Sequence, residues 1–392
     1  MNIDMPGGPP AKPCRGATRA SYRRTVVAIS AVICLVGCGR ETAGAGGSVS
    51  DETPTLAKGA AKASPAITLR SSGTRSFFDF YEATATMIPA QSETQLIASV
   101  GDVEFAYPEG PIYLADPSQG NVKVYDLDGT LERVLGRKGR GPGEFMSPRF
   151  VQITAKKSAY VVDTGQNRIE VFDSTGAFLN SIPFQGFSGV RGFGMLSDGS
   201  LLFLVGGPGD VLLHTDSTAR ILSRHLPIGQ IRPEGEQDDG IWSYARNFFL
   251  DVRNDTAFVI ASVSNQLWAV DVKSGGISHA IIDFPSYDPP EVPRLEGVEK
   301  TPQNAIKELL THDLAGFIRT THDDILIPFI RGNLIDGDPV TLLRGSPTGE
   351  WSTISDGPIL VGAHGDNLIG VENPATDLMT FTIFRPRGPS EP

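Results

Sequence analysis

The sequence predicts an all-β fold made of a repeated four-stranded unit, and three observations lead to this prediction. Glycine and proline are abundant, with 44 and 29 residues in a chain of 392, which is about 19% of the chain against an ordinary ~12%. Both residues interrupt helix interiors and favour turns between short strands. Two segments 47 residues apart match closely, and further pairs of strand-like segments follow them. A period of roughly 40–50 residues with several strands per unit is typical of a β-propeller.

Composition argues against two other classes. Hydrophobic residues make up 40% of the chain, which is enough for a packed core and excludes wholesale disorder. The net charge is −11, whereas a general nucleic-acid binder needs a basic surface. We therefore expect a folded protein with no nucleic-acid partner.

The N-terminus has the organisation of a bacterial export signal. Residues 1–24 contain five basic side chains and one acidic one, and an uncharged run over residues 25–37 follows. As a helix this run would rise about 20 Å, which is short of the roughly 30 Å of a bilayer core. A basic segment before an apolar run of this length indicates a signal peptide over residues 1–37, not a transmembrane helix.

The signal ends in Leu-Val-Gly-Cys at residues 35–38, which resembles a bacterial lipobox. The resemblance implies that Cys38 is lipidated and anchors the protein to a membrane facing the periplasm or the outside. The alternative is a plain signal peptide that contains Cys38. No cysteine follows Cys38, so we expect no disulfide, and the mature chain would carry a net charge of about −15. Residues 38–70 are rich in small and polar residues and predict a flexible tether.

The clearest repeat lies within residues 96–183. Each copy contains a strand, a short polar turn, an alternating second strand and an Asp-x-x-Gly turn. Matching positions of the two copies are Tyr113 and Tyr160, Asp126 and Asp173, and Gly129 and Gly176. We expect the recurring aspartates, Asp116 and Asp163 included, to accept backbone N–H groups at the turns, a structural role.

These units resemble NHL repeats, and the glycine-rich segment 139–145 followed by Pro148 resembles the link between NHL blades. The whole is similar to six-bladed β-propeller lipoproteins of bacteria. The resemblance implies six four-stranded antiparallel blades, and we assign residues 71–392 to them. The spacing of strand-like segments supports four further units, at residues 202–216, 257–271, 325–343 and 367–384.

A ring of blades needs closure, because an open edge strand favours aggregation. Residues 95–101 resemble the outer strand of the first unit, residues 131–136. We therefore expect an N-terminal strand, residues 95–100, to supply the outer strand of the last blade.

One segment departs from the repeat. Residues 284–312 separate the fourth and fifth units and are too long for a turn within a blade. Thr301 followed by Pro302 is typical of a helix start, and Ile306, Leu309 and Leu310 would share one face. We expect a short helix in an inserted loop on one face of the propeller.

No pattern in the sequence indicates a catalytic site. The six histidines lack the spacing of metal ligands, and no Gly-x-Ser-x-Gly nucleophile motif occurs. We therefore expect no catalytic residue and no resident cofactor or metal. A channel Ca²⁺ held by scattered carboxylate and amide oxygens stays open as an alternative, with Glu104 and Glu109 as candidate ligands.

Three arginines recur in register. Arg149, Arg191 and Arg246 each precede a phenylalanine at the predicted start of an inner strand, 24 or 25 residues before the aspartate of their unit. Equivalent positions of successive blades converge on the propeller axis. Because arginine binds carboxylate or phosphate with paired hydrogen bonds, the sequence predicts an anion or acidic-partner site at one channel mouth. The alternative is that these arginines pair with neighbouring carboxylates and tie the blades together.

These expectations favour a non-enzymatic, membrane-tethered binding module. Its ligand would be an envelope protein, a peptide or a small anion, because repeat folds present stiff loops and a central channel for binding. The alternative is a hydrolase or lactonase with a divalent metal in the channel, because propellers support both kinds of function.

Overall fold

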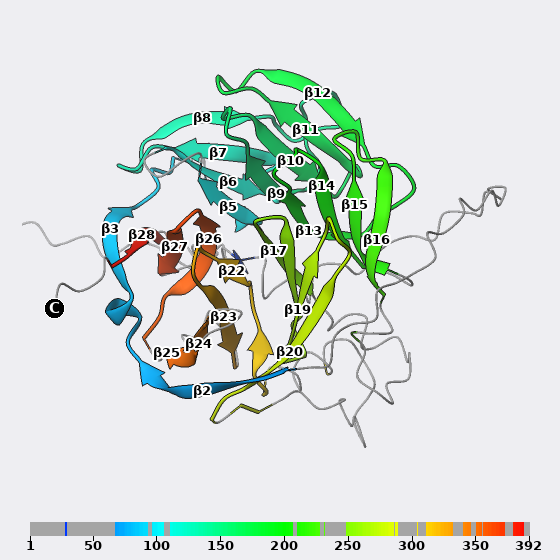
Figure 1. Ribbon diagram of the computed structural model, residues 1–392. Helices are drawn as coiled ribbons and strands as arrows, with labels where there is room; N and C mark the ends of the chain where they lie inside the picture. The colour runs from blue at the N-terminus through cyan, green and yellow to red at the C-terminus, as the bar shows by residue number, and fades with distance from the viewer. Residues whose placement is uncertain are drawn as a thin grey trace, which may run out of the picture.

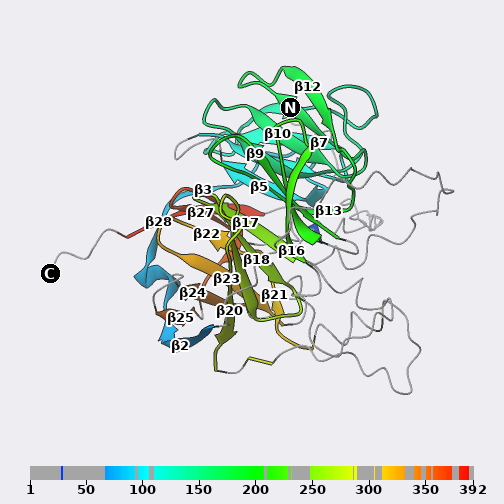
Figure 2. The ribbon, with the colours of Figure 1, turned by 45° about the vertical axis from the view of Figure 1, so that its right-hand side comes forward.

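Figure 1 shows the computed structural model, in which short strands form blades around a central axis. The structure describes residues 28–29, 67–92, 96–105, 110–206, 210–227, 231, 248–285, 287–288, 304, 311–331, 340–345, 350–354, 356–372 and 379–387. Figure 2, turned by 45°, separates the cyan and green blades on one side of the ring from the yellow to red blades on the other. Cys38, most of the predicted signal and tether, and the helix expected within residues 284–312 lie outside the described residues.

Blades 1 to 3 each contain four antiparallel strands in chain order. Blade 1 consists of β5 (Asp102–Phe105), β6 (Ile112–Asp116), β7 (Asn121–Tyr125) and β8 (Leu131–Leu135). Blade 2 consists of β9 (Pro148–Ile153), β10 (Ala159–Asp163), β11 (Arg168–Phe172) and β12 (Phe178–Pro183). Blade 3 consists of β13 (Val190–Met195), β14 (Leu201–Val205), β15 (Asp210–Thr215) and β16 (Ile221–Pro227).

Blades 4 and 5 share an additional strand. Blade 4 consists of β17 (Phe248–Arg253), β18 (Thr256–Ala261), β19 (Gln266–Asp271) and β20 (Ile277–Asp283). Blade 5 consists of two short inner strands, β21 (Leu314–Ala315) and β22 (Arg319–Thr320), followed by β23 (Ile325–Ile330), β24 (Val340–Gly345) and β25 (Trp351–Ile354). The N-terminal strand β2 (Ile67–Arg75) pairs in parallel first with β20 and then with β25. One strand therefore joins the outer edges of two blades, along the lower rim in Figure 1.

Blade 6 closes the ring. It consists of β26 (Ile359–His364), β27 (Asn367–Glu372), β28 (Thr380–Pro386) and, from the N-terminal end of the chain, β3 (Tyr81–Met87). A 3₁₀ turn, η1 (Phe77–Asp79), connects β2 to β3. The expected closure by an N-terminal strand is confirmed, and it joins both ends of the propeller through the antiparallel pair β28–β3.

The prediction that residues 95–100 form this closing strand was wrong. The strand that pairs with β28 is β3. Within that segment, Ala98 and Ser99 donate backbone N–H groups to the Asp116 carboxylate at 2.8 and 3.1 Å. The segment before blade 2 makes the same contact with Asp163. Segment 96–100 therefore leads into an innermost strand, and its resemblance to an outer strand came from a short apolar pattern that both share. Its last two residues, β4 (Ser99–Val100), pair outside the blades with β1 (Ala28–Ile29).

The apolar core lies between the blades. Within the described residues six apolar clusters occur, and each fills the seam between two neighbouring blades. In β14, Leu202 and Leu204 face blade 4, whereas Leu201 and Phe203 face blade 2. Strands covered on both faces are continuous apolar runs and do not alternate. The innermost strands contact one another in sequence around the axis, and this ring positions the candidate site.

Candidate functional site

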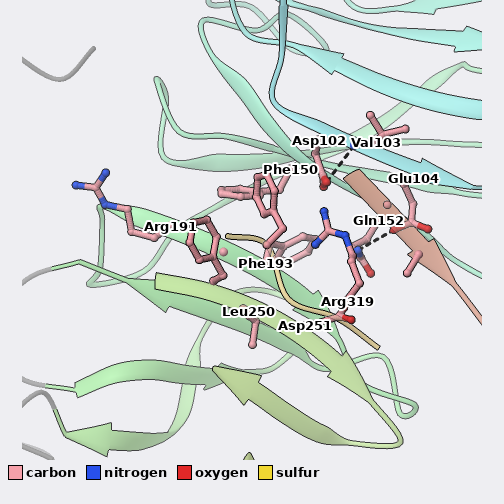
Figure 3. A pocket seen from close by; sticks show the side chains of 15 residues that line it. Asp102, Val103, Glu104, Phe150, Gln152, Arg191, Phe193, Leu250, Asp251 and Arg319 are labelled. Atoms are coloured by element: carbon pink, nitrogen blue, oxygen red, sulfur yellow. Dashed lines mark hydrogen bonds between the residues drawn. The ribbon is translucent and has the colours of Figure 1, made fainter. Parts of the chain in front are cut away.

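The candidate site is a pocket on the propeller axis, lined by residues from the innermost segments of all six blades. Its cavity volume is about 50 Å³, room for roughly three to five water molecules. Four phenylalanines form an apolar wall, which we call the phenylalanine wall: Phe150, Phe193, Phe249 and Phe317. Five polar side chains at the opposite end from Arg191 (Figure 3), which we call the polar layer, also line the pocket: Asp102, Glu104, Gln152, Asp251 and Arg319. Figure 3 shows Phe150 and Phe193 between the polar layer and Arg191, which points away from it.

Asp102 and Asp251 connect blades through the free edges of innermost strands. Asp102 accepts the backbone N–H of Val151, on the next blade, at 3.0 Å. Asp251 accepts both the backbone N–H and the hydroxyl of Thr320, again on the next blade, at 2.5 and 2.8 Å. An innermost strand has no further strand to satisfy its channel-facing amides, so these carboxylates supply the missing acceptors.

Burial has the largest effect on the pKa of both carboxyls. It raises the pKa of Asp102 to about 7 and the pKa of Asp251 to about 6. The Arg319 guanidinium and the donated N–H groups act in the opposite direction but do not compensate fully. The polar layer therefore gains and loses protons near neutral pH.

Arg319 connects blade 5 to blade 6. Its Nη2 donates to the Val361 carbonyl at 2.6 Å and its Nη1 to the Ile318 carbonyl at 3.1 Å. The guanidinium carbon lies 4.8 Å from the centre of the Phe317 ring, a cation–π contact. Within the described part of the chain, Arg319 has no ion-pair partner and its buried Nε has no hydrogen bond.

Glu104, on blade 1, contacts both neighbouring blades, 6 and 2. It accepts from Gln152 Nε2, on blade 2, at 3.2 Å and lies 3.3 Å from Nδ1 of His364, on blade 6. This contact with Glu104 raises the pKa of His364. Hydrogen bonds of the polar layer thus link blades 4, 5, 6, 1 and 2 in turn.

Blade 3 joins its neighbours differently. In the described residues it contributes no hydrogen bond to this axial series. It packs directly instead: a Cβ placed on Gly194 would lie 2.4 Å from Cγ2 of Val252, on blade 4. Blade 3 therefore contributes Arg191 and Phe193 to the pocket lining, and among the described residues the Arg191 side chain forms no hydrogen bond.

Arg191 is the predicted arginine that the structure places at the pocket. It lies on β13, is partly exposed, and has neither a hydrogen bond nor an ion pair among the described residues. Arg149 lies on β9 but is not part of the pocket lining. Arg246 lies outside the described residues. The joint three-arginine site therefore stays a prediction, with Arg191 as the member at the pocket.

The sequence patterns missed the polar layer. Asp102 and Asp251 are acidic residues within short innermost strands. An acidic residue at such a position could have indicated a side chain that faces the channel. Arg319 begins a strand of only two residues, β22, so no periodicity marks its orientation. The aspartates that the repeats did mark have the structural role expected of them: Asp173, for example, accepts backbone N–H groups from Thr175 and Ala177.

The described residues contain neither a metal-ligand cluster nor a membrane-spanning helix. Among the described residues, no group of three or more His, Cys, Asp or Glu side chains is arranged to hold a metal ion. Glu104 is bonded within the polar layer, and Glu109 lies outside the described residues. The described part of the chain contains no apolar helix with the length needed to span a bilayer.

The ring of blades and the axial pocket define a β-propeller with a site in its channel. The chain belongs to the DUF5128 family, described as a 6-bladed beta-propeller, whose family model matches residues 90–334, more than half of the sequence. A comparison with curated proteins finds no match.

Two solved structures share the fold. A Bacteroides fragilis protein described as exported is 13% identical with a TM-score of 0.59, covering 82% of this chain and 99% of its own. A member of the DUF4221 family from Bacteroides vulgatus is 13% identical with a TM-score of 0.58, covering 79% of this chain and 99% of its own. A streptogramin B lyase, 12% identical over 80% of this chain and 100% of its own, has a TM-score of 0.45, too low to support an inference. At these identities the likenesses support the fold alone.

Proposed function

We propose that this protein is a membrane-tethered, extracytoplasmic binding module without catalytic activity of its own. Its site is the channel mouth beside Arg191, and its ligand carries an anionic group on an envelope protein, a peptide or a small molecule. The proposal of export and anchoring rests on the predicted signal over residues 1–37 and on Cys38. The exported Bacteroides fragilis protein of the same fold is consistent with that location. Cys38→Ser should move the protein from the membrane fraction to the soluble fraction.

The observation that carries the proposal is the state of Arg191. Arg191 lines the pocket together with Phe150 and Phe193 and is partly exposed, and a guanidinium at a pocket rim is suited to a carboxylate or phosphate partner. Arg191 has no such partner among the described residues, although the chain carries 45 acidic side chains. An anionic ligand would supply the partner.

The carboxylates of the polar layer favour binding over metal-dependent hydrolysis. Asp102, Asp251 and Glu104 already accept hydrogen bonds that join neighbouring blades. A catalytic Ca²⁺ would need oxygen ligands that converge on one point. Asp102 and Asp251 instead interact electrostatically with the Arg319 guanidinium, which acts to lower the pKa of both, and its positive charge opposes a cation there.

The test is isothermal titration calorimetry of the purified protein with benzoate, inorganic phosphate and an acidic peptide. For whichever of these probes binds, Arg191→Gln should reduce the affinity about tenfold or more. The reason is that a charge-assisted hydrogen bond contributes about 1.5–3 kcal/mol. The matched control is Arg224→Gln, on the exposed outer strand β16 of the same blade, which makes the same change in net charge. Equal affinities of the wild type and Arg191→Gln would refute the proposed site.

A further inference from the structure

We infer that the ligand of this pocket is a small amphipathic anion that binds with its apolar end inward and its anionic group at the rim on Arg191. The inference rests on the proposed function and specifies the ligand class and orientation. Three features of the described residues lead to it: the order of side chains along the pocket, the charges of the polar layer, and the size of the cavity.

The side chains lie in an order suited to an amphipathic molecule. Arg191 points outward at one end, Phe150 and Phe193 follow, and Arg319 lies with Asp102 at the other end (Figure 3). Phe193 is 6% exposed and Phe249 is 8% exposed, whereas Phe150 and Phe317 are partly exposed, so the part of the phenylalanine wall open to a ligand is formed mainly by Phe150 and Phe317. Apolar atoms that replace water against such a wall gain about fourfold in affinity for each buried methylene.

The polar layer is an unfavourable place for the anionic group of a ligand. It contains three carboxyls, Asp102, Asp251 and Glu104, against the single guanidinium of Arg319. Both Nη groups of Arg319 already donate to backbone carbonyls. A ligand carboxylate placed there would meet the three carboxyls of the layer, so the anionic group stays at the rim, where Arg191 is partly exposed.

The cavity limits the apolar end. A cavity of about 50 Å³ is smaller than the ~150 Å³ cavity that holds a benzene molecule. A short branched chain therefore fits the deep part, whereas a fused ring system does not. The ligand class is a monoanion with a compact aliphatic body.

The test uses isothermal titration calorimetry with matched small molecules. The probes are 3-methylbutyrate, its alcohol and amine analogues 3-methylbutanol and 3-methylbutylamine, acetate, and naphthalene-2-acetate. We expect 3-methylbutyrate to bind at least tenfold more tightly than each of the other four. Arg191→Gln should reduce its affinity to that of 3-methylbutanol, and Arg224→Gln should leave it unchanged. Phe150→Leu, which keeps the wall apolar, should retain binding, whereas Phe150→Asn should weaken it about tenfold.

The outcomes separate this inference from the proposed function. If acetate binds as tightly as 3-methylbutyrate and both depend on Arg191, the anion site stands and the amphipathic orientation is overturned. If naphthalene-2-acetate binds best, the size limit is wrong. If the amine binds best, or if no probe binds at 10 mM while circular dichroism reports a folded protein, the inference is refuted. If binding occurs but Arg191→Gln leaves it unchanged, the proposed site fails as well.

Discussion

The carboxylate of Asp251, on blade 4, accepts the backbone N–H of Thr320, on blade 5, at 2.5 Å. This bond crosses a seam that is packed with apolar side chains and is also bridged by Arg253, which donates to the Thr321 carbonyl at 2.6 Å. Asp102 and Val151 repeat the relationship between blades 1 and 2 at 3.0 Å. A buried carboxylate is costly when ionised, so the charge that joins the blades also makes their stability depend on pH.

Asp251→Asn should flatten this pH dependence. The pKa of Asp251 is raised to about 6, while the unfolded chain has a value near ~3.9. The native protein therefore holds a proton that the unfolded chain has released, and stability falls as pH rises from about 4 to 6. Asparagine keeps an oxygen acceptor for Thr320 and removes the titration. The difference in unfolding free energy between variant and wild type should change by up to about 1.4 kcal/mol per pH unit in this window.

Urea unfolding at pH 4.5, 6 and 7.5 measures this difference, and other titrating groups cancel in it. Asp216→Asn is the control, because the hydrogen bond from Thr218 is the main cause that lowers the pKa of Asp216 to about 2. Asp216 is ionised throughout the window, so its replacement should shift stability equally at the three pH values. Parallel curves for wild type and Asp251→Asn would contradict the prediction.

Lys123→Met should be strongly destabilising. Lys123 donates to Asp116 at 2.9 Å and to Asn121 at 3.0 Å, and the side chains of Lys123 and Asp116 are 0% exposed. Removing the ammonium leaves a buried carboxylate without its counter-charge, at a cost of about 3–5 kcal/mol. Equilibrium urea unfolding gives the value. Arg220→Gln, which breaks an exposed pair with Asp216, should cost no more than ~1 kcal/mol; similar losses for both variants would rule out the role assigned to Lys123.

Two N-terminal deletions should have different effects. Strand β2 adds to blades 4 and 5, which already contain the strands of a complete blade, whereas β3 is the outer strand of blade 6. A chain that begins at residue 76 should remain folded and free of aggregation, with a lowered melting temperature. A chain that begins at residue 88 also loses Tyr81, which is 0% exposed and donates to Asp324 at 2.5 Å.

The second deletion bares the edge of β28, and we expect it to aggregate. Size-exclusion chromatography and thermal unfolding monitored by circular dichroism distinguish the two chains. A monomeric, cooperatively folded protein beginning at residue 88 would show that β3 is not needed for closure.

Gly129→Ala should destabilise the protein more than Gly199→Ala. Both glycines have positive φ angles, +88° and +82°, so alanine is strained at both. A Cβ on Gly129 would lie 2.2 Å from the Ile88 carbonyl oxygen, whereas a Cβ on Gly199 meets nothing within 4 Å. The clash should add about 1–3 kcal/mol for Gly129 alone. Urea unfolding of both variants measures the difference, and equal losses would mean that Ile88 moves away freely.

Much of the architecture could be predicted because each blade carries local signals. Alternating strands and Asp-x-x-Gly turns recur at nearly constant spacing, and they indicated blades 1 and 2 most clearly. The closing strand was harder, because its partner β28 lies almost 300 residues away in the sequence. A short apolar segment gives no indication of which distant edge it joins.

The candidate site could be predicted only in part. Arg191 was found because it recurs in register with strand starts. Asp102, Asp251 and Arg319 were missed because a residue faces the axis only after its blade has been placed and twisted. In blade 5 the innermost strand is split into two short pieces, β21 and β22, which carry no periodic signal.

The amino-acid order alone specified an all-β repeat, its turns and its acidity, and it predicts an N-terminal export signal, since these depend on neighbours along the chain. Folding decided the closing strand, the seams and the polar layer, because these depend on distances between residues far apart in sequence. Arg319 illustrates the difference. Its charge is plain in the sequence, but only the ring of six blades places it beside Asp102 and Asp251, where burial shifts the protonation of both.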